Sequence, residues 1–109
     1  MMTLENLNTY VDEAMQRRSK YVGDRFSEIR NGIPVVTIVI KTNNAFPGKK
    51  YLEFESSKTS NNDVVVTAIY KKYEDSGTVP ITLLSRAVNQ WLANPKRPFP
   101  FPKNGYFTV

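Results

Sequence analysis

The alternation of apolar and polar residues predicts a helix near the N-terminal end of the chain. Between residues 3 and 19, apolar side chains recur at steps of three and four, which places them on one side of a helix. The residues of this stripe are Leu4, Leu7, Val11, Ala14 and Met15. Thr3 is suited to cap the first turn, and we expect the helix to end near Tyr21 or Val22.

The next part of the chain predicts a β-hairpin. Asn31-Gly32 favours a two-residue turn, because both residues tolerate positive φ, and it would join residues 25–30 to residues 33–41. In the competing interpretation, residues 24–30 are a last helical turn that Gly32 closes. The second segment is apolar on both sides, so we expect a central strand that is covered on both faces of its sheet.

Two further strands and a loop follow the hairpin. Residues 49–55 alternate between apolar and polar side chains, and residues 63–73 are rich in β-branched residues. The polar segment between them is short, so the two strands should pair in antiparallel fashion. Residues 74–78 contain Asp, Ser and Gly, which indicate a loop.

A second amphipathic helix is predicted after that loop. Its apolar stripe consists of Ile81, Leu84, Val88, Trp91 and Leu92. Pro80 fits the first turn of this helix, with Thr78 nearby as a cap, and Pro95 stops it.

These elements together predict one α+β domain over residues 1–95. It would contain an N-terminal helix, a three- to four-stranded antiparallel meander sheet and a second helix. The remaining segment, residues 96–109, alternates Pro with Phe, and we expect an extended tail. Its aromatic side chains are costly to leave in water, so the tail would dock on its own domain or on a partner. These candidate partner-binding residues are Phe99, Phe101, Tyr106 and Phe107.

The composition argues against an enzyme. The chain has no Cys and no His, which excludes a thiol nucleophile, a histidine base, a disulfide and a thiolate metal site. Glu53 and Glu55 share one face of a strand, but two solvated charges are the simpler interpretation. We therefore expect no catalytic residue, no cofactor and no metal.

The apolar runs and the charge narrow the class of partner. No apolar run approaches the length needed to cross a membrane, and the N-terminus lacks a signal-peptide pattern, so we expect a cytoplasmic protein. The formal net charge is +5, and residues 76–109 contribute four of these charges without one acidic residue. This asymmetry favours an anionic partner, although a solubilising surface would also explain it.

Basic and aromatic residues alternate in three segments, as expected for a protein that binds single-stranded nucleic acid. Cations hold the phosphates there, and aromatic rings stack on the bases. The candidate ligands are Lys49, Lys50, Tyr51, Tyr70, Lys71, Lys72, Tyr73, Arg97 and Lys103. In the simpler interpretation, the lysines protect strand ends against aggregation and the tyrosines cover the rim of the core.

The sequence thus predicts a small non-enzymatic accessory protein that binds nucleic acid, preferably single-stranded DNA or RNA. A short basic chain without Cys or His also fits the accessory proteins of phages and mobile elements. The alternative is a protein-interaction module, an adaptor or a small inhibitor, that uses the aromatic tail. A second copy of the chain is one partner that the tail could reach, which would give a homodimer.

Overall fold

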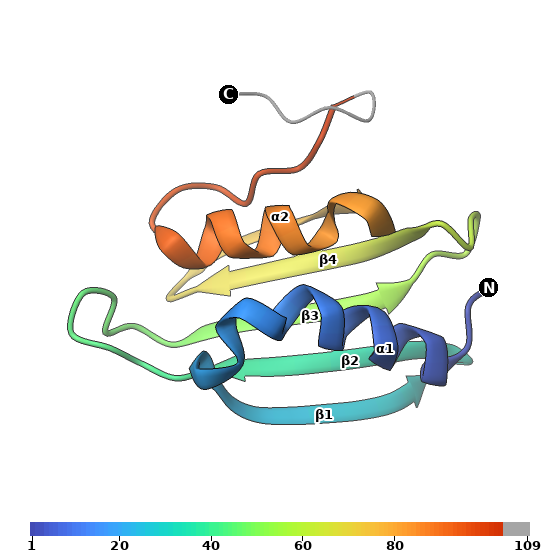
Figure 1. The fold of residues 1–109 in the computed structure, drawn as a ribbon, viewed down its shortest axis with the longest axis horizontal. Coiled ribbons are helices and arrows are strands. Elements are labelled where there is room, and N and C mark those ends of the chain that lie inside the picture. Colours follow the sequence, from blue (N-terminus) through green and yellow to red (C-terminus); the bar gives the residue numbers. More distant parts are fainter. Residues whose placement is uncertain (104–109) are drawn as a thin grey trace.

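A computed structural model describes residues 1–103 of the chain, which form five antiparallel strands in one sheet and two α-helices on the same face of it (Figure 1). The elements in chain order are α1 (Leu4–Met15), a 3-10 helix η1 (Gln16–Tyr21), β1 (Val22–Arg30), β2 (Ile33–Ile40), β3 (Lys50–Ser56), β4 (Asp63–Tyr70), β5 (Tyr73–Pro80) and α2 (Ile81–Ala93). The strands lie in sequence order, each beside the next. The predicted α+β meander between two helices is confirmed, with five strands in place of three to four.

The first helix is shorter than the sequence pattern suggested. Thr3 caps it as predicted, since its Oγ1 accepts a hydrogen bond from the backbone N–H of Asn6 at 3.1 Å. The α-helix ends at Met15, however, and the chain continues as the 3-10 helix η1 to Tyr21. Residues 16–20 contain no apolar side chain to bury, and tertiary packing of an apolar face is what stabilises most helices.

The hairpin between β1 and β2 is confirmed, and the competing helical turn is wrong. Asn31 and Gly32 both have positive φ, 53° and 77°, and Arg30 pairs with Ile33 across the turn. These angles belong to the two-residue turn whose twist matches that of the flanking strands.

The predicted loop over residues 74–78 is wrong, because these residues belong to β5. The predicted strand 63–73 instead breaks after Tyr70, and Lys71-Lys72 form a second two-residue turn that pairs Tyr70 with Tyr73. Asp, Ser and Gly have low strand propensity. Pairing along the whole of β4 makes this segment a strand in spite of its composition.

The expected cover on both faces of the sheet is also wrong. α1 contacts β1, β2 and β3, whereas α2 contacts β4 and β5, and Figure 1 shows both helices in front of the strands. No segment within residues 1–103 lies against the opposite face, which we call the bare face. Val35 is nevertheless 1% exposed there, because its neighbours across the sheet are the long side chains of Glu28 and Glu55.

The second helix begins at the end of β5 without the expected cap. Pro80 occupies the N-cap position and Thr78 makes no capping bond; the N–H of Ile81 instead donates to the carbonyl oxygen of Asn62 at 2.8 Å. Neither α1 nor α2 is long and apolar enough to cross a membrane, within the residues that the structure describes.

The start of the tail packs on its own domain. Phe99 is buried, with its ring centroid 6.2 Å from that of Trp91 and 4.8 Å from that of Phe101. Its N–H donates to Asp75 Oδ2 at 3.2 Å. Phe101 lies on Gly77, where an added Cβ would come within 2.8 Å of the ring. The predicted contact residues Tyr106 and Phe107 fall outside the described residues.

Candidate nucleic-acid interface

The topology brings the ends of most elements to one end of the sheet. A single row of paired residues crosses all five strands there, from Val22 through Ile40, Lys50 and Tyr70 to Tyr73. η1 ends directly before this row, and α2 runs back from the far end of β5 to reach it (Figure 1). Segments 16–21, 41–49, 71–72 and 94–97 therefore meet at this end.

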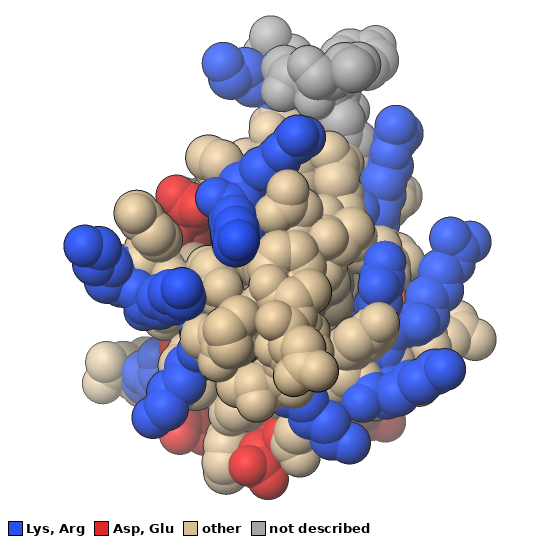
Figure 2. All heavy atoms as spheres, turned by 90° about the vertical axis from the view of Figure 1, so that its left-hand side faces the viewer, with Lys and Arg blue, Asp and Glu red and all other residues tan. Residues whose placement is uncertain are grey.

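These four segments carry nine of the fifteen lysines and arginines of the chain. We call them the basic end: Arg17, Arg18, Lys20, Lys41, Lys49, Lys71, Lys72, Lys96 and Arg97. All are exposed except Arg18, which is half-buried. Figure 2 looks onto this end and shows basic side chains around an uncharged centre, with few acidic ones.

The charges of the basic end are not neutralised by neighbouring carboxylates. Within residues 1–103, the ion pairs join Arg25 to Asp12 and Arg30 to Glu28 and Glu53, and none involves the basic end. Since the whole chain has a formal net charge of +5, the nine cations leave a net charge of −4 on the remainder. Asp24, Glu74 and Asp75 also lie close to the row of paired residues, so this end keeps a formal net charge of +6 and the rest of the chain has −1.

Aromatic rings lie among these cations. Tyr73 is 64% exposed and Tyr21 is 36% exposed, while Phe46 in the loop before β3 is half-buried. The guanidinium of Arg18 lies 5.5 Å from the ring centroid of Tyr21, and Lys96 Nζ lies 5.8 Å from that of Phe46. Cations and aromatic faces thus alternate in space, although they come from segments far apart in the sequence.

Lys50 is not part of this surface, contrary to the sequence-based expectation. It is 2% exposed, and its Nζ donates to the carbonyl oxygens of Phe46 at 2.6 Å and Gly48 at 3.3 Å. Burial lowers the pKa of Lys50. Lys49, the last residue of the loop before β3, is exposed. Lys50 therefore fixes the loop that presents Lys49.

Three of the other predicted ligands are not exposed at the basic end. Tyr70 is buried, with its ring beneath Lys71, whose Nζ lies 5.3 Å from the ring centroid. Tyr51 lies on the bare face between its partners in β2 and β4. Lys103 is exposed, but it follows Phe101, which contacts Gly77 in the middle of β5 and not at the basic end. Lys49, Lys71, Lys72, Tyr73 and Arg97 are brought together.

The turn between β4 and β5 holds a cation at a conformationally unfavourable position. Lys71 has φ 57°, a left-handed conformation that costs a residue other than Gly about 1–2 kcal/mol. The equivalent turn between β1 and β2 uses Asn31-Gly32, which adopt such angles readily. The turn between β1 and β2 thus has residues that adopt positive φ at little energetic cost, whereas the turn between β4 and β5 has lysines at the same positions.

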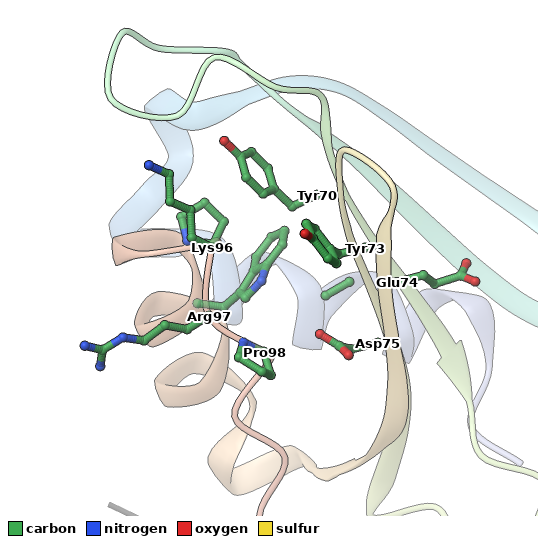
Figure 3. A pocket seen from close by; sticks show the side chains of 10 residues that line it. Tyr70, Tyr73, Glu74, Asp75, Lys96, Arg97 and Pro98 are labelled. Carbon is green, nitrogen blue, oxygen red and sulfur yellow. The ribbon is translucent and has the colours of Figure 1, made fainter.

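A pocket of about 310 Å³ opens beside this turn, between the β4–β5 hairpin and the segment that follows α2 (Figure 3). The residues that line it include Tyr70, Tyr73, Asp75, Trp91, Lys96 and Arg97. Asp75 points toward the pocket, whereas the side chain of Glu74 points to the other side of β5. Lys96 and Arg97 extend outward from its rim.

The carboxylates of the bare face interact with Arg30 and with one another. Arg30 donates to Glu28 at 2.8 Å and to Glu53 at 2.9 Å, and these hydrogen bonds raise its pKa. Burial raises the pKa of the Glu55 carboxyl, and its neighbour Glu53 acts in the same direction. No group of three acidic residues in the described part of the chain could hold a metal ion.

The residues that sequence reasoning missed lie in η1, in the loop between β2 and β3, and directly after α2: Arg17, Arg18, Lys20, Tyr21, Lys41, Phe46 and Lys96. The cluster at positions 17, 18 and 20 was visible in the sequence, but only the meander places it beside residues 71–72. The chain matches no protein-family model, and comparison with curated proteins and with solved structures finds no significant match.

Proposed function

We propose that the protein binds single-stranded nucleic acid, DNA or RNA, through its basic end and acts as a small non-enzymatic accessory protein. The observation that carries this proposal is the convergence of nine cations from four segments on one end of the sheet. A surface that only keeps a protein soluble disperses charges of both signs. Here the cations are concentrated, and the remainder of the chain is net acidic.

The aromatic rings favour a single strand over a duplex. Tyr21, Phe46 and Tyr73 offer ring faces among the cations, and unpaired bases can stack on such faces. In a duplex the base faces are already stacked on one another, so they are not available to these rings. The unfavourable φ of Lys71 adds support, since Asn or Gly would suit the turn better and would carry no charge.

The direct test is a fluorescence-anisotropy titration with a labelled single strand of about 15 nucleotides, which is within the usual site size. We expect binding whose log K falls linearly with log salt, with a slope of about 0.7 per phosphate contact. The duplex of the same sequence should bind more weakly at the same salt. A flat titration with the single strand at about 50 mM salt would refute the proposal.

A pair of charge-reversal variants locates the binding surface. Lys71→Glu with Lys72→Glu removes two cations of the basic end, and Lys58→Glu changes an exposed lysine in the loop between β3 and β4, at the other end of the sheet. Two lost phosphate contacts reduce affinity roughly 60-fold at about 50 mM salt. We expect at least that loss in the double variant and less than a twofold change in the control. Because the double variant changes the charge by four units and the control by two, a control whose loss in log affinity is half that of the double variant would mean that binding follows net charge alone.

The alternative function, protein interaction through the tail, has less support. Phe99 is buried against Trp91, and Phe101 covers Gly77, so both aromatic residues are engaged within the domain. To reach a partner, these rings would have to leave the core and expose apolar surface to water.

A further inference from the structure

We infer that the pocket beside the β4–β5 turn receives one unpaired nucleobase, with Tyr73 as the stacking face and the phosphates held at the rim. This inference rests on the proposed function and makes it specific, because it names the part of the nucleic acid that enters the protein.

The size of the pocket suits a ligand no larger than one nucleotide. Ligand pockets usually have volumes of about 300–1,000 Å³, and this one, at about 310 Å³, is at the lower limit. A planar base fits such a volume, whereas a dinucleotide or a folded peptide segment does not. The pocket opens to the solvent beside Lys96 and Arg97, so the sugar and phosphate would remain outside (Figure 3).

Three aromatic rings line the pocket, together with Ala68, Pro95 and Pro98. Tyr73 is the most exposed large apolar residue of the described chain, at 64%, and it forms one side of the opening. Trp91 and Tyr70 lie deeper, and both are about 3% exposed. A base that enters would therefore place its face against the accessible ring of Tyr73. Its edge would lie against the rings of Trp91 and Tyr70, which the core already holds rigid.

The charge of the pocket determines which part of the ligand enters. The carboxylate of Asp75 points toward the interior, held by the N–H of Phe99. A phosphate inside would be repelled by this carboxylate, but a neutral base would not. The cations lie at the rim and in the adjacent turn: Lys96, Arg97, Lys71 and Lys72. An anionic strand can avoid the carboxylate of Asp75 and also contact the cations of the rim only if its base points inward and its backbone follows the rim.

Trp91 gives this inference a direct spectroscopic readout. It is the only tryptophan of the chain, and it lines the pocket. A base that enters should therefore change the tryptophan fluorescence, whereas a strand that binds only the outer cations should not. The experiment compares a strand of ten thymidines with an abasic sugar-phosphate strand of equal length, each followed by anisotropy and by tryptophan emission.

We expect both strands to bind at low salt, and only the thymidine strand to change the emission of Trp91. Tyr73→Ala should weaken binding of the thymidine strand roughly 5- to 150-fold, the range for one lost stacking contact, and leave the abasic strand unaffected. Tyr73→Phe keeps the ring and should bind like the wild type. Tyr21→Ala, at the same end but outside the pocket, should preserve the emission change. Because Tyr73 is largely exposed, its variants should retain the melting temperature.

The outcomes separate the inference from the function on which it rests. If the thymidine strand binds without changing the emission of Trp91, or if Tyr73→Ala binds it like the wild type, the pocket does not receive a base and the proposed function stands. If neither strand binds at low salt, the proposed function fails and the inference fails with it.

Discussion

The adjacent residues Lys49 and Lys50 allow the two roles of lysine at the basic end to be tested with the same substitution. Lys49 is exposed, whereas Lys50 is buried and donates to the carbonyl oxygens of Phe46 and Gly48. Methionine preserves most of the length and the apolar packing of lysine but removes the ammonium. Lys49→Met should therefore affect binding alone, and Lys50→Met should affect the fold.

The magnitudes follow from the contacts. Without the ammonium of Lys50, the carbonyl oxygen of Phe46 loses a donor at 2.6 Å, and an unpaired buried carbonyl costs about 1–3 kcal/mol. The cost of burying the charge, which also lowers the pKa of Lys50, is recovered in the variant. We expect a net loss of about 1–2 kcal/mol, or a decrease in Tm of roughly 4–10 °C. The Tm of Lys49→Met should stay within about 2 °C of the wild type.

For binding, one lost phosphate contact lowers the affinity for a single strand about 8-fold at 50 mM salt and about 3-fold at 200 mM. Lys49→Met should show this loss and a salt slope that is smaller by about 0.7. Circular dichroism gives Tm, and anisotropy at the two salt concentrations gives the slope. If Lys50→Met melted like the wild type and lost as much affinity as Lys49→Met, the assignment of Lys50 to the interior would be refuted.

Three further substitutions test separate parts of the reasoning. Because Asn tolerates positive φ, Lys71→Asn should leave the free energy of unfolding unchanged or raise it by up to about 1 kcal/mol. It should also reduce the salt slope of binding. A destabilisation of more than about 1 kcal/mol in urea would show that Lys71 is needed for packing. Phe99→Ala should cost about 3 kcal/mol in urea unfolding and shift the emission of Trp91 to longer wavelength, and an unchanged midpoint would mean that the tail does not stabilise the core. Because burial and Glu53 raise the pKa of Glu55, the folded chain holds a proton there that the unfolded chain has lost, so stability falls as pH rises from the ordinary glutamate pKa to the raised one. Glu55→Gln should remove that fall in urea midpoints measured across this range and should be at least as stable as the wild type at neutral pH; a less stable variant would contradict the direction of the shift.

The elements with strong local patterns could be predicted from the sequence. The apolar stripe of α1 and the Asn31-Gly32 turn are each determined within a few residues, and both were found. β5 could not be found in the same way. Its residues have low strand propensity, its turn lacks the usual Asn-Gly signal, and it is a strand because β4 offers a full set of hydrogen-bonding partners.

The candidate site was only partly predictable, for a similar reason. The strand alternation already places Lys50 on the side of Leu52 and Phe54, so its burial could have been read from the sequence. The contribution of η1 to the basic end could not. It depends on the order of all five strands, on both helices lying on one face, and on α2 returning to the end where α1 stops. No local pattern specifies this arrangement.

The separation of charge has a kinetic consequence. Nine cations lie at one end of the longest axis of the molecule, and the remainder is net acidic, so the protein has a large electric dipole (Figure 1, Figure 2). In the field of a distant polyanion, such a dipole turns the basic end forward before any contact forms. A larger fraction of random encounters with the polyanion then leads to binding. Added salt shortens the range of this field and therefore slows association.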